Sequence, residues 1–168
     1  TDSFVTMGEI RQAESLRALD ILGVPRDDIS FLGFPDGGLM RLWRDHYPDD
    51  APYASPYTGH DSPPYPESVD TSAEYVGTDL VSLLERVIRL AGPNLIVIPH
   101  PGDAHSDHAA AGRFAIEAIE PRIAAWNERN RKLNADGDTL NDERKLWTTE
   151  CGNRRYREED EKAIQAGK

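Results

Sequence analysis

The stretch that decides the predicted fold is NLIVIPHPGDAHSDHAAAGRFAIEAIE, residues 94–120. It opens with the apolar run NLIVIP, which is typical of a strand buried on both faces of a parallel sheet. A loop rich in histidine follows, and then a helix is predicted from near Asp107 to about Glu120. Pro121 either kinks that helix or starts the next one. A strand, a loop and a helix in this order indicate a doubly wound α/β domain.

The segment before this stretch predicts a helix over residues 78–91. Its apolar side chains recur on one helical face, at Leu80, Leu84, Val87, Ile88 and Ala91. Thr78 is the predicted N-cap, and Gly92 with Pro93 ends the helix.

The N-terminal third predicts a strand end, a helix and a second strand. Residues 3–6 are interpreted as the end of a short strand, and residues 9–22 as a helix that stops at Gly23. The segment DISFLGF, residues 28–34, predicts a short strand that is closed by the turn PDGG.

Length and charge exclude several classes of protein. A chain of 168 residues suits one domain. Its 19 Lys and Arg residues stand against 30 Asp and Glu residues, so nucleic acid is not an expected partner. The longest apolar run, Leu95–Ile98, is far shorter than the roughly 18 residues of a membrane span. The single cysteine Cys151 fits a reducing compartment, so we expect a cytoplasmic protein that does not bind membranes.

Two segments do not follow this alternation of strands and helices. Residues 46–69 are rich in Pro and Tyr and carry no apolar period, which is typical of a functional or disordered loop. Residues 134–168 form a divergent C-terminal segment, in which KLWTTEC, residues 145–151, is a candidate late strand.

The histidine loop, HPGDAHSDH at residues 100–108, follows the carboxyl end of a predicted strand. Open parallel sheets bind ligands at this position. His105 and His108 are three residues apart at a helix start, so their imidazoles can point to the same side. Asp107 lies between them and can accept a proton from a ring nitrogen, which would aim the other nitrogen. The pair therefore indicates a catalytic or metal site, although surface histidines at this spacing also occur by chance. Two histidines are an incomplete zinc site, since catalytic zinc usually has three protein ligands.

Three motifs together resemble the LmbE-like or PIG-L family of N-acetylglucosaminyl deacetylases. HPGDAHSDHAAAGR is similar to the family's second histidine motif, with Ser106 in place of the usual proline. TMGEIRQAESLRALDILGV is similar to its Thr-x-Gly-Glu segment, and FLGFPDGGL to its Phe-Leu-Gly-x-x-Asp-Gly-x-Leu segment. The motifs follow in the family's order and span Thr6 to Arg113.

The resemblance implies a Rossmann-like fold, a mostly parallel sheet with helices on both faces. It also implies a divalent metal, usually zinc, and an amino-sugar substrate whose N-acetyl group is hydrolysed. By position, His108 would be a metal ligand, and His105 the imidazole that stabilises the oxyanion and assists the leaving amine. Asp107 would orient His105. Residues that would line the sugar pocket are Glu9, Arg11 and Asp36.

One family motif has no counterpart in the sequence. The family's first motif, Ala-His-Pro-Asp-Asp-Glu, supplies the remaining metal ligands and the general base, and it lies upstream of the segment at which this sequence begins. We therefore expect a single, N-terminally incomplete domain over residues 1–168, without the first strand-helix-strand unit. Zinc is expected to bind this chain weakly or not at all. The chain could associate with the missing segment or form a homo-oligomer.

Two functions of different classes remain open. One is a metal-dependent hydrolase that removes an N-acetyl or similar acyl group from an amino sugar or its conjugate. The alternative is a catalytically inactive carbohydrate-binding or interaction module of the same fold. A nucleotide-binding domain is disfavoured, because GFPDGG is not a Gly-x-Gly-x-x-Gly fingerprint.

Overall fold

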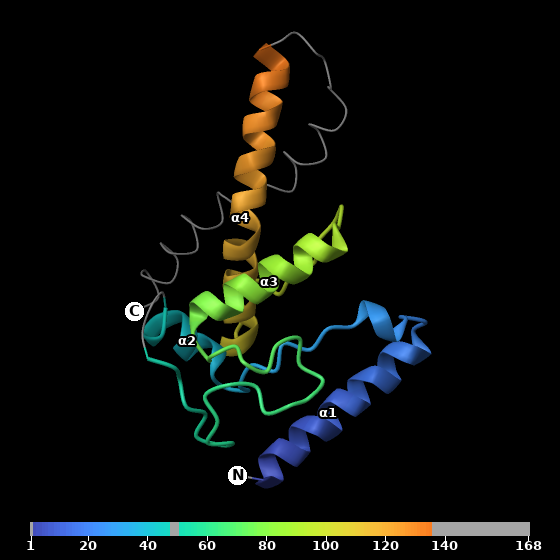
Figure 1. The fold of residues 1–168 in the computed structure, drawn as a ribbon, viewed down its shortest axis with the longest axis vertical. Coiled ribbons are helices and arrows are strands. Elements are labelled where there is room, and N and C mark those ends of the chain that lie inside the picture. The colour runs from blue at the N-terminus through green and yellow to red at the C-terminus, as the bar shows by residue number, and fades with distance from the viewer. Residues whose placement is uncertain (1, 48–50, 136–168) are drawn as a thin grey trace. The chain divides into compact units, whose positions relative to one another are not determined.

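A computed structural model describes residues 2–47 and 51–135 of the chain. These residues form helices joined by irregular segments (Figure 1). In chain order the helices are α1 (Asp2–Ile21), the 3₁₀ helix η1 (Arg26–Asp28), α2 (Leu39–Asp45), α3 (Gly77–Ala91) and α4 (Ser106–Ala135). The chain divides into two compact units, Thr1–Glu120 and Pro121–Lys168, and the first contains every predicted site residue.

The predicted Rossmann-like sheet is wrong, because the described residues form no strand. Their β pairing is confined to one isolated parallel bridge between Phe31 and Ser68. The apolar run of residues 94–99 has no regular secondary structure, and no backbone hydrogen bond joins it to another segment of residues 2–47 or 51–135. Leu95 and Val97 within it are 64% and 87% exposed. An apolar run becomes a strand only where a neighbour takes its backbone N–H and C=O groups, and composition does not supply that neighbour.

The helix predicted over residues 9–22 is confirmed, but it begins earlier. α1 starts at Asp2, so the strand end predicted at residues 3–6 is wrong. The helix buries no residue completely, and Phe4 and Met7 stay about half exposed. Local helix propensity therefore determines this segment more than burial does.

The helix predicted over residues 78–91 is confirmed almost to the residue by α3. Gly92 ends it in the left-handed conformation, with φ of 55°, as its role as a helix stop requires. The predicted N-cap is wrong by two residues, because the N-cap is Val76, which makes no side-chain capping bond.

α4 confirms the helix predicted after the histidine loop and extends it. It begins at Ser106 and continues through Pro121 to Ala135, so Pro121 does not end it. Proline has no N–H to donate to the preceding turn, but the rest of the helix forms on both sides of it. The segments predicted in residues 136–168, including the candidate strand KLWTTEC, lie outside the described residues.

The core of the first unit joins three helices. Leu42 of α2, Leu80 of α3 and Phe114 of α4 form a buried apolar cluster. Trp43 meets the Phe114 ring edge-on, with the ring centroids 5.0 Å apart. Because α2, α3 and the start of α4 share this cluster, the histidine loop that leads into α4 has a fixed base.

The segment predicted as a strand at residues 28–34 takes part only in the Phe31 bridge, so that prediction is wrong. The turn after it is confirmed, and Gly37 takes a φ of 69° there. A residue with a Cβ is strained at such an angle. The turn leads directly into α2, which the sequence patterns did not predict.

The described part of the 46–69 segment contains no helix and packs on the chain before α2. Val69 donates its N–H to the carbonyl of Phe31, and Tyr53 donates to the carbonyl of Tyr75. The Tyr75 side chain is buried, and its hydroxyl donates to the carbonyl of Gly33 at 2.9 Å.

No helix within residues 2–47 and 51–135 is long and apolar enough to cross a membrane.

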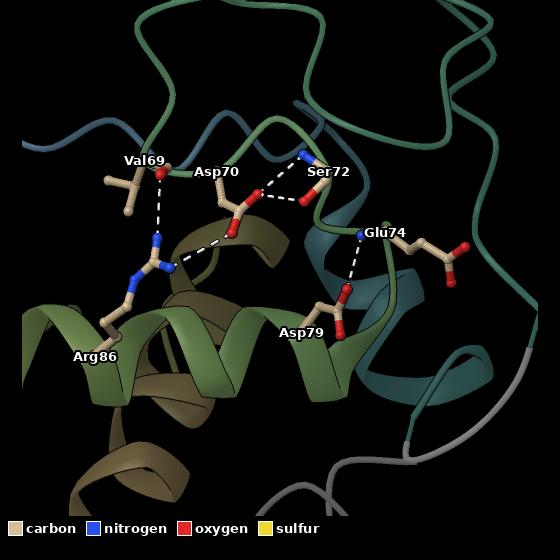
Figure 2. A network of polar contacts seen from close by, with 6 residues as sticks. All are labelled: Val69, Asp70, Ser72, Glu74, Asp79 and Arg86. Atoms are coloured by element: carbon tan, nitrogen blue, oxygen red, sulfur yellow. Dashed lines mark hydrogen bonds and ion pairs between the residues drawn. The ribbon is translucent and has the colours of Figure 1, made fainter.

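A polar network attaches the 69–74 segment to α3 (Figure 2). Arg86 of α3 donates to the carbonyl of Val69 at 3.0 Å and to the carboxylate of Asp70 at 3.4 Å. The same carboxylate accepts the hydroxyl of Ser72 at 2.6 Å and its N–H at 3.0 Å. These bonds join the end of the loop to a helix of the core.

We expect Asp70→Asn to lower the melting temperature at neutral pH by a small amount. The bonds from Ser72, followed by the charge of Arg86, hold the pKa of Asp70 below its ordinary value of 3.8. A lowered pKa means that Asp70 stabilises the fold above the unfolded-state pKa, and that this contribution is lost as the pH falls through the folded-state pKa. Melting curves of both proteins at neutral and acidic pH should therefore converge on the acidic side.

Glu74→Gln is the matched control, because the Glu74 side chain points away from the network and only its N–H takes part (Figure 2). A gap between Asp70→Asn and wild type that stays constant down to the most acidic pH would contradict the assignment.

Candidate functional site

The histidine loop is held against the start of α4 by close backbone packing. A Cβ on Gly112 of α4 would overlap the carbonyl oxygen of Pro99, so only glycine permits this approach. Within the loop, Asp103 accepts the N–H of His105 at 2.8 Å. The carbonyl of His105 accepts the N–H of Ala109 at 3.0 Å and so opens the helix.

His105 and His108 lie together, as their spacing predicted. Their ring centroids are 4.5 Å apart and the rings are tilted by 34°. Both residues are exposed, so a substrate or an ion can reach them. His100, the third histidine of the loop, accepts the N–H of Gly102 on its Nδ1 and lies outside this pair.

Asp103 is the acidic neighbour of the pair, and the sequence patterns did not single it out. Its Oδ2 lies 3.5 Å from Nδ1 of His108. The N–H of His105 and, less strongly, the charge of His108 hold the pKa of Asp103 below its usual value. The signal that could have identified it is its place two residues before a helix-opening residue, where Asp commonly binds a backbone N–H.

Asp107 is buried and takes part in different contacts from those its sequence position indicated. It was expected to accept a proton from an imidazole, but its carboxylate accepts the N–H of Gly37 at 2.6 Å and that of Leu39 at 3.2 Å. Gly37 and Leu39 lie at the start of α2, where backbone N–H groups have no partner within the helix. Asp107 thereby joins the first turn of α4 to the turn that carries Asp36.

The three residues predicted to line a sugar pocket divide into two groups. Glu9 and Asp36 both lie near Tyr65: burial first, and then the charges of these two carboxylates, raise the pKa of the Tyr65 hydroxyl. Arg11 is exposed and pairs with Glu14 on its own helix at 3.1 Å. None of the three has a hydrogen bond or ion pair with His105 or His108 in the described part of the chain.

A metal site is not complete within residues 2–47 and 51–135. No group of three or more His, Cys, Asp or Glu side chains there is arranged to hold a metal ion. The imidazole pair of His105 and His108 provides two nitrogen donors. Catalytic zinc usually takes three protein ligands, so the described residues do not fit it by themselves.

Comparison with known proteins gives one match. The family model described as PIG-L: GlcNAc-PI de-N-acetylase matches residues 2–119, which include both histidines of the pair and all three predicted pocket residues. No curated protein matches the chain, and no solved structure does.

Proposed function

This chain belongs to the PIG-L: GlcNAc-PI de-N-acetylase family, and we propose that it hydrolyses the N-acetyl group of an amino sugar or its conjugate. The observation that carries the proposal is the exposed imidazole pair, which lies inside the matched residues. In this reaction water adds to the amide carbonyl, the C–N bond breaks, and acetate and a free amine leave. An imidazole suits both the charge that develops on the carbonyl oxygen and the proton that the amine needs.

His105 is proposed as the imidazole that donates to the developing oxyanion and protonates the leaving amine. The hydrogen bond from the His105 N–H to Asp103 fixes the His105 backbone at the helix start, and His105 is exposed. Asp107 supports it indirectly: the bonds to Gly37 and Leu39 hold the first turn of α4, and His105 directly precedes that turn. Asp107 is therefore proposed as a positioning residue.

His108 is proposed as one ligand of a divalent metal, with zinc as the first candidate. Its contact with Asp103 at 3.5 Å resembles the second-sphere carboxylates that orient metal-binding imidazoles. Because the described residues supply no complete ligand set, we assign no catalytic step to the metal. Glu9, Arg11 and Asp36 are proposed to bind the hydroxyl groups of the sugar.

We expect isothermal titration of the 168-residue chain with zinc to give no tight one-to-one site. Two imidazoles do not compete well with water and buffer for the ion, since catalytic zinc usually takes three protein ligands. A stoichiometric, tight transition that disappears in His108→Ala would contradict this expectation.

A second candidate function is a carbohydrate-binding module without catalysis. The incomplete ligand set among the described residues favours it, as do the carboxylates of Glu9 and Asp36 near Tyr65. The deciding experiment incubates the full-length protein with N-acetylglucosamine conjugates and measures free amine over time. Amine that accumulates with the enzyme concentration supports the hydrolase; saturable sugar binding with no amine supports the module.

A further inference from the structure

Tyr65 occupies a place that none of the sequence motifs assigned. It belongs to the irregular segment 51–69, and its ring lies directly on α1, since a Cβ on Gly8 would overlap the Tyr65 ring and hydroxyl. Gly8 immediately precedes Glu9, one of the predicted pocket residues. The Thr-x-Gly-Glu segment therefore needs its glycine in order to admit the tyrosine.

The chain around Tyr65 is fixed from the other side by the segment that leads to Asp36. The carbonyl of Tyr65 accepts the N–H of Ser68 at 3.0 Å, and Ser68 forms the bridge with Phe31. A Cβ on Gly33 would overlap the Ser68 hydroxyl, so these two segments are also in close contact. Tyr65 thus contacts α1 through its side chain and is joined to residues 31–33 through Ser68.

Three polar groups near this contact make no hydrogen bond or ion pair within the described residues. Tyr65 is partly buried, and within residues 2–47 and 51–135 its hydroxyl makes no hydrogen bond. The carboxylates of Glu9 and Asp36 are exposed and have no hydrogen bond or ion pair there either. The Tyr65 hydroxyl can donate a hydrogen bond, whereas the two carboxylates only accept. Burial first, and then the charges of Glu9 and Asp36, raise the pKa of Tyr65 above its ordinary value of 10.0.

A sugar matches this set of groups, because each of its hydroxyls both donates and accepts. A carboxylate takes the proton of a sugar hydroxyl, while a phenolic hydroxyl can donate to that sugar's oxygen. We propose that Tyr65 is a substrate-binding residue, whose hydroxyl binds the sugar ring together with Glu9 and Asp36. This inference rests on the proposed function, to which it adds a residue that determines affinity.

The test compares Tyr65→Phe with wild type in the full-length protein, on N-acetylglucosamine conjugates. Loss of one hydrogen bond should raise KM about 3- to 10-fold and leave kcat nearly unchanged, because the bond forms equally in the ground state and the transition state. The dissociation constant for N-acetylglucosamine, measured by ligand-observed NMR, should rise by the same factor. Tyr57→Phe is the matched control, since Tyr57 lies in the same segment and its ring contacts Phe4.

Gly8→Ala provides a second variant. Alanine favours a helix more than glycine does, so α1 should not be weakened, yet its Cβ displaces the Tyr65 ring. We expect the same rise in KM and in the dissociation constant. The melting temperature should change little, because the gain in helix propensity offsets the cost of displacing the ring.

The outcomes separate this inference from the function on which it rests. An active wild type with unchanged KM and dissociation constant in Tyr65→Phe overturns the role of Tyr65 alone. A fall in kcat with KM unchanged also overturns it. A wild type that neither binds N-acetylglucosamine nor hydrolyses its conjugates overturns the proposed function, and this inference with it.

Discussion

His105→Ala should lower the turnover number for N-acetyl hydrolysis by about 10²- to 10³-fold, the effect of removing one donor to a developing oxyanion. The imidazole lies exposed at the start of α4, and its ring centroid is 4.5 Å from that of His108. Alanine removes the donor but keeps the backbone, whose N–H binds Asp103 and whose carbonyl opens the helix. The fold should survive, and kcat should carry the loss.

Two variants in the same loop serve as comparisons. His100→Ala should retain a turnover close to wild type, because His100 lies outside the imidazole pair and contacts Gly102 through its ring. In protein equilibrated with excess zinc, His108→Ala should lower the amount of bound zinc, whereas His105→Ala should keep it. Wild-type kcat in His105→Ala would contradict the catalytic role, and full metal occupancy in His108→Ala would contradict the ligand role.

Asp107→Ala should destabilise the fold by about 2–3 kcal/mol, which is the scale of hydrogen bonds to a charged acceptor. The buried carboxylate accepts two backbone N–H groups at the start of α2, from Gly37 and Leu39. Alanine leaves both donors without their acceptor. Denaturant unfolding measures the loss, and amide hydrogen exchange should become faster at Gly37 and Leu39.

Asp107→Asn tests the same two hydrogen bonds with a smaller chemical change. Its amide oxygen can still accept the short bond from Gly37, so the loss should be smaller than in the alanine variant. Ser106→Ala is the neighbouring control, since Ser106 is exposed and its side chain makes no hydrogen bond within residues 2–47 and 51–135. Equal stability of Asp107→Ala and wild type would show that these bonds do not fix the turn.

The long helices α1, α3 and the first part of α4 were predictable from the sequence, because their signals are local, whereas the short helix α2 was not predicted. The apolar face of residues 78–91 and the stop at Gly92 are sufficient to define α3. The strands were not predictable in the same way. Residues 94–99 have the composition of a buried strand, but strand formation depends on a partner elsewhere in the chain, and the described residues provide none.

The candidate site was likewise predictable only where its signals are local. The spacing of His105 and His108 at a helix start was sufficient to predict that their rings lie together. The partners of Asp107 were not predictable, since Gly37 and Leu39 are about seventy positions away and come near only through the packing of α2 and α4. The contact of Tyr65 with Gly8 has the same origin, because an irregular loop carries no periodic signal for its destination.

The most direct test of the central claim is a proton NMR time course of the full-length protein with an N-acetylglucosamine conjugate. Acetate and the free amino sugar are quantified together, because hydrolysis of the amide releases them in equal amounts. We predict equimolar acetate and amine that accumulate with wild type and are strongly reduced with His105→Ala. Binding of the conjugate without acetate release would contradict the hydrolase and support the carbohydrate-binding module.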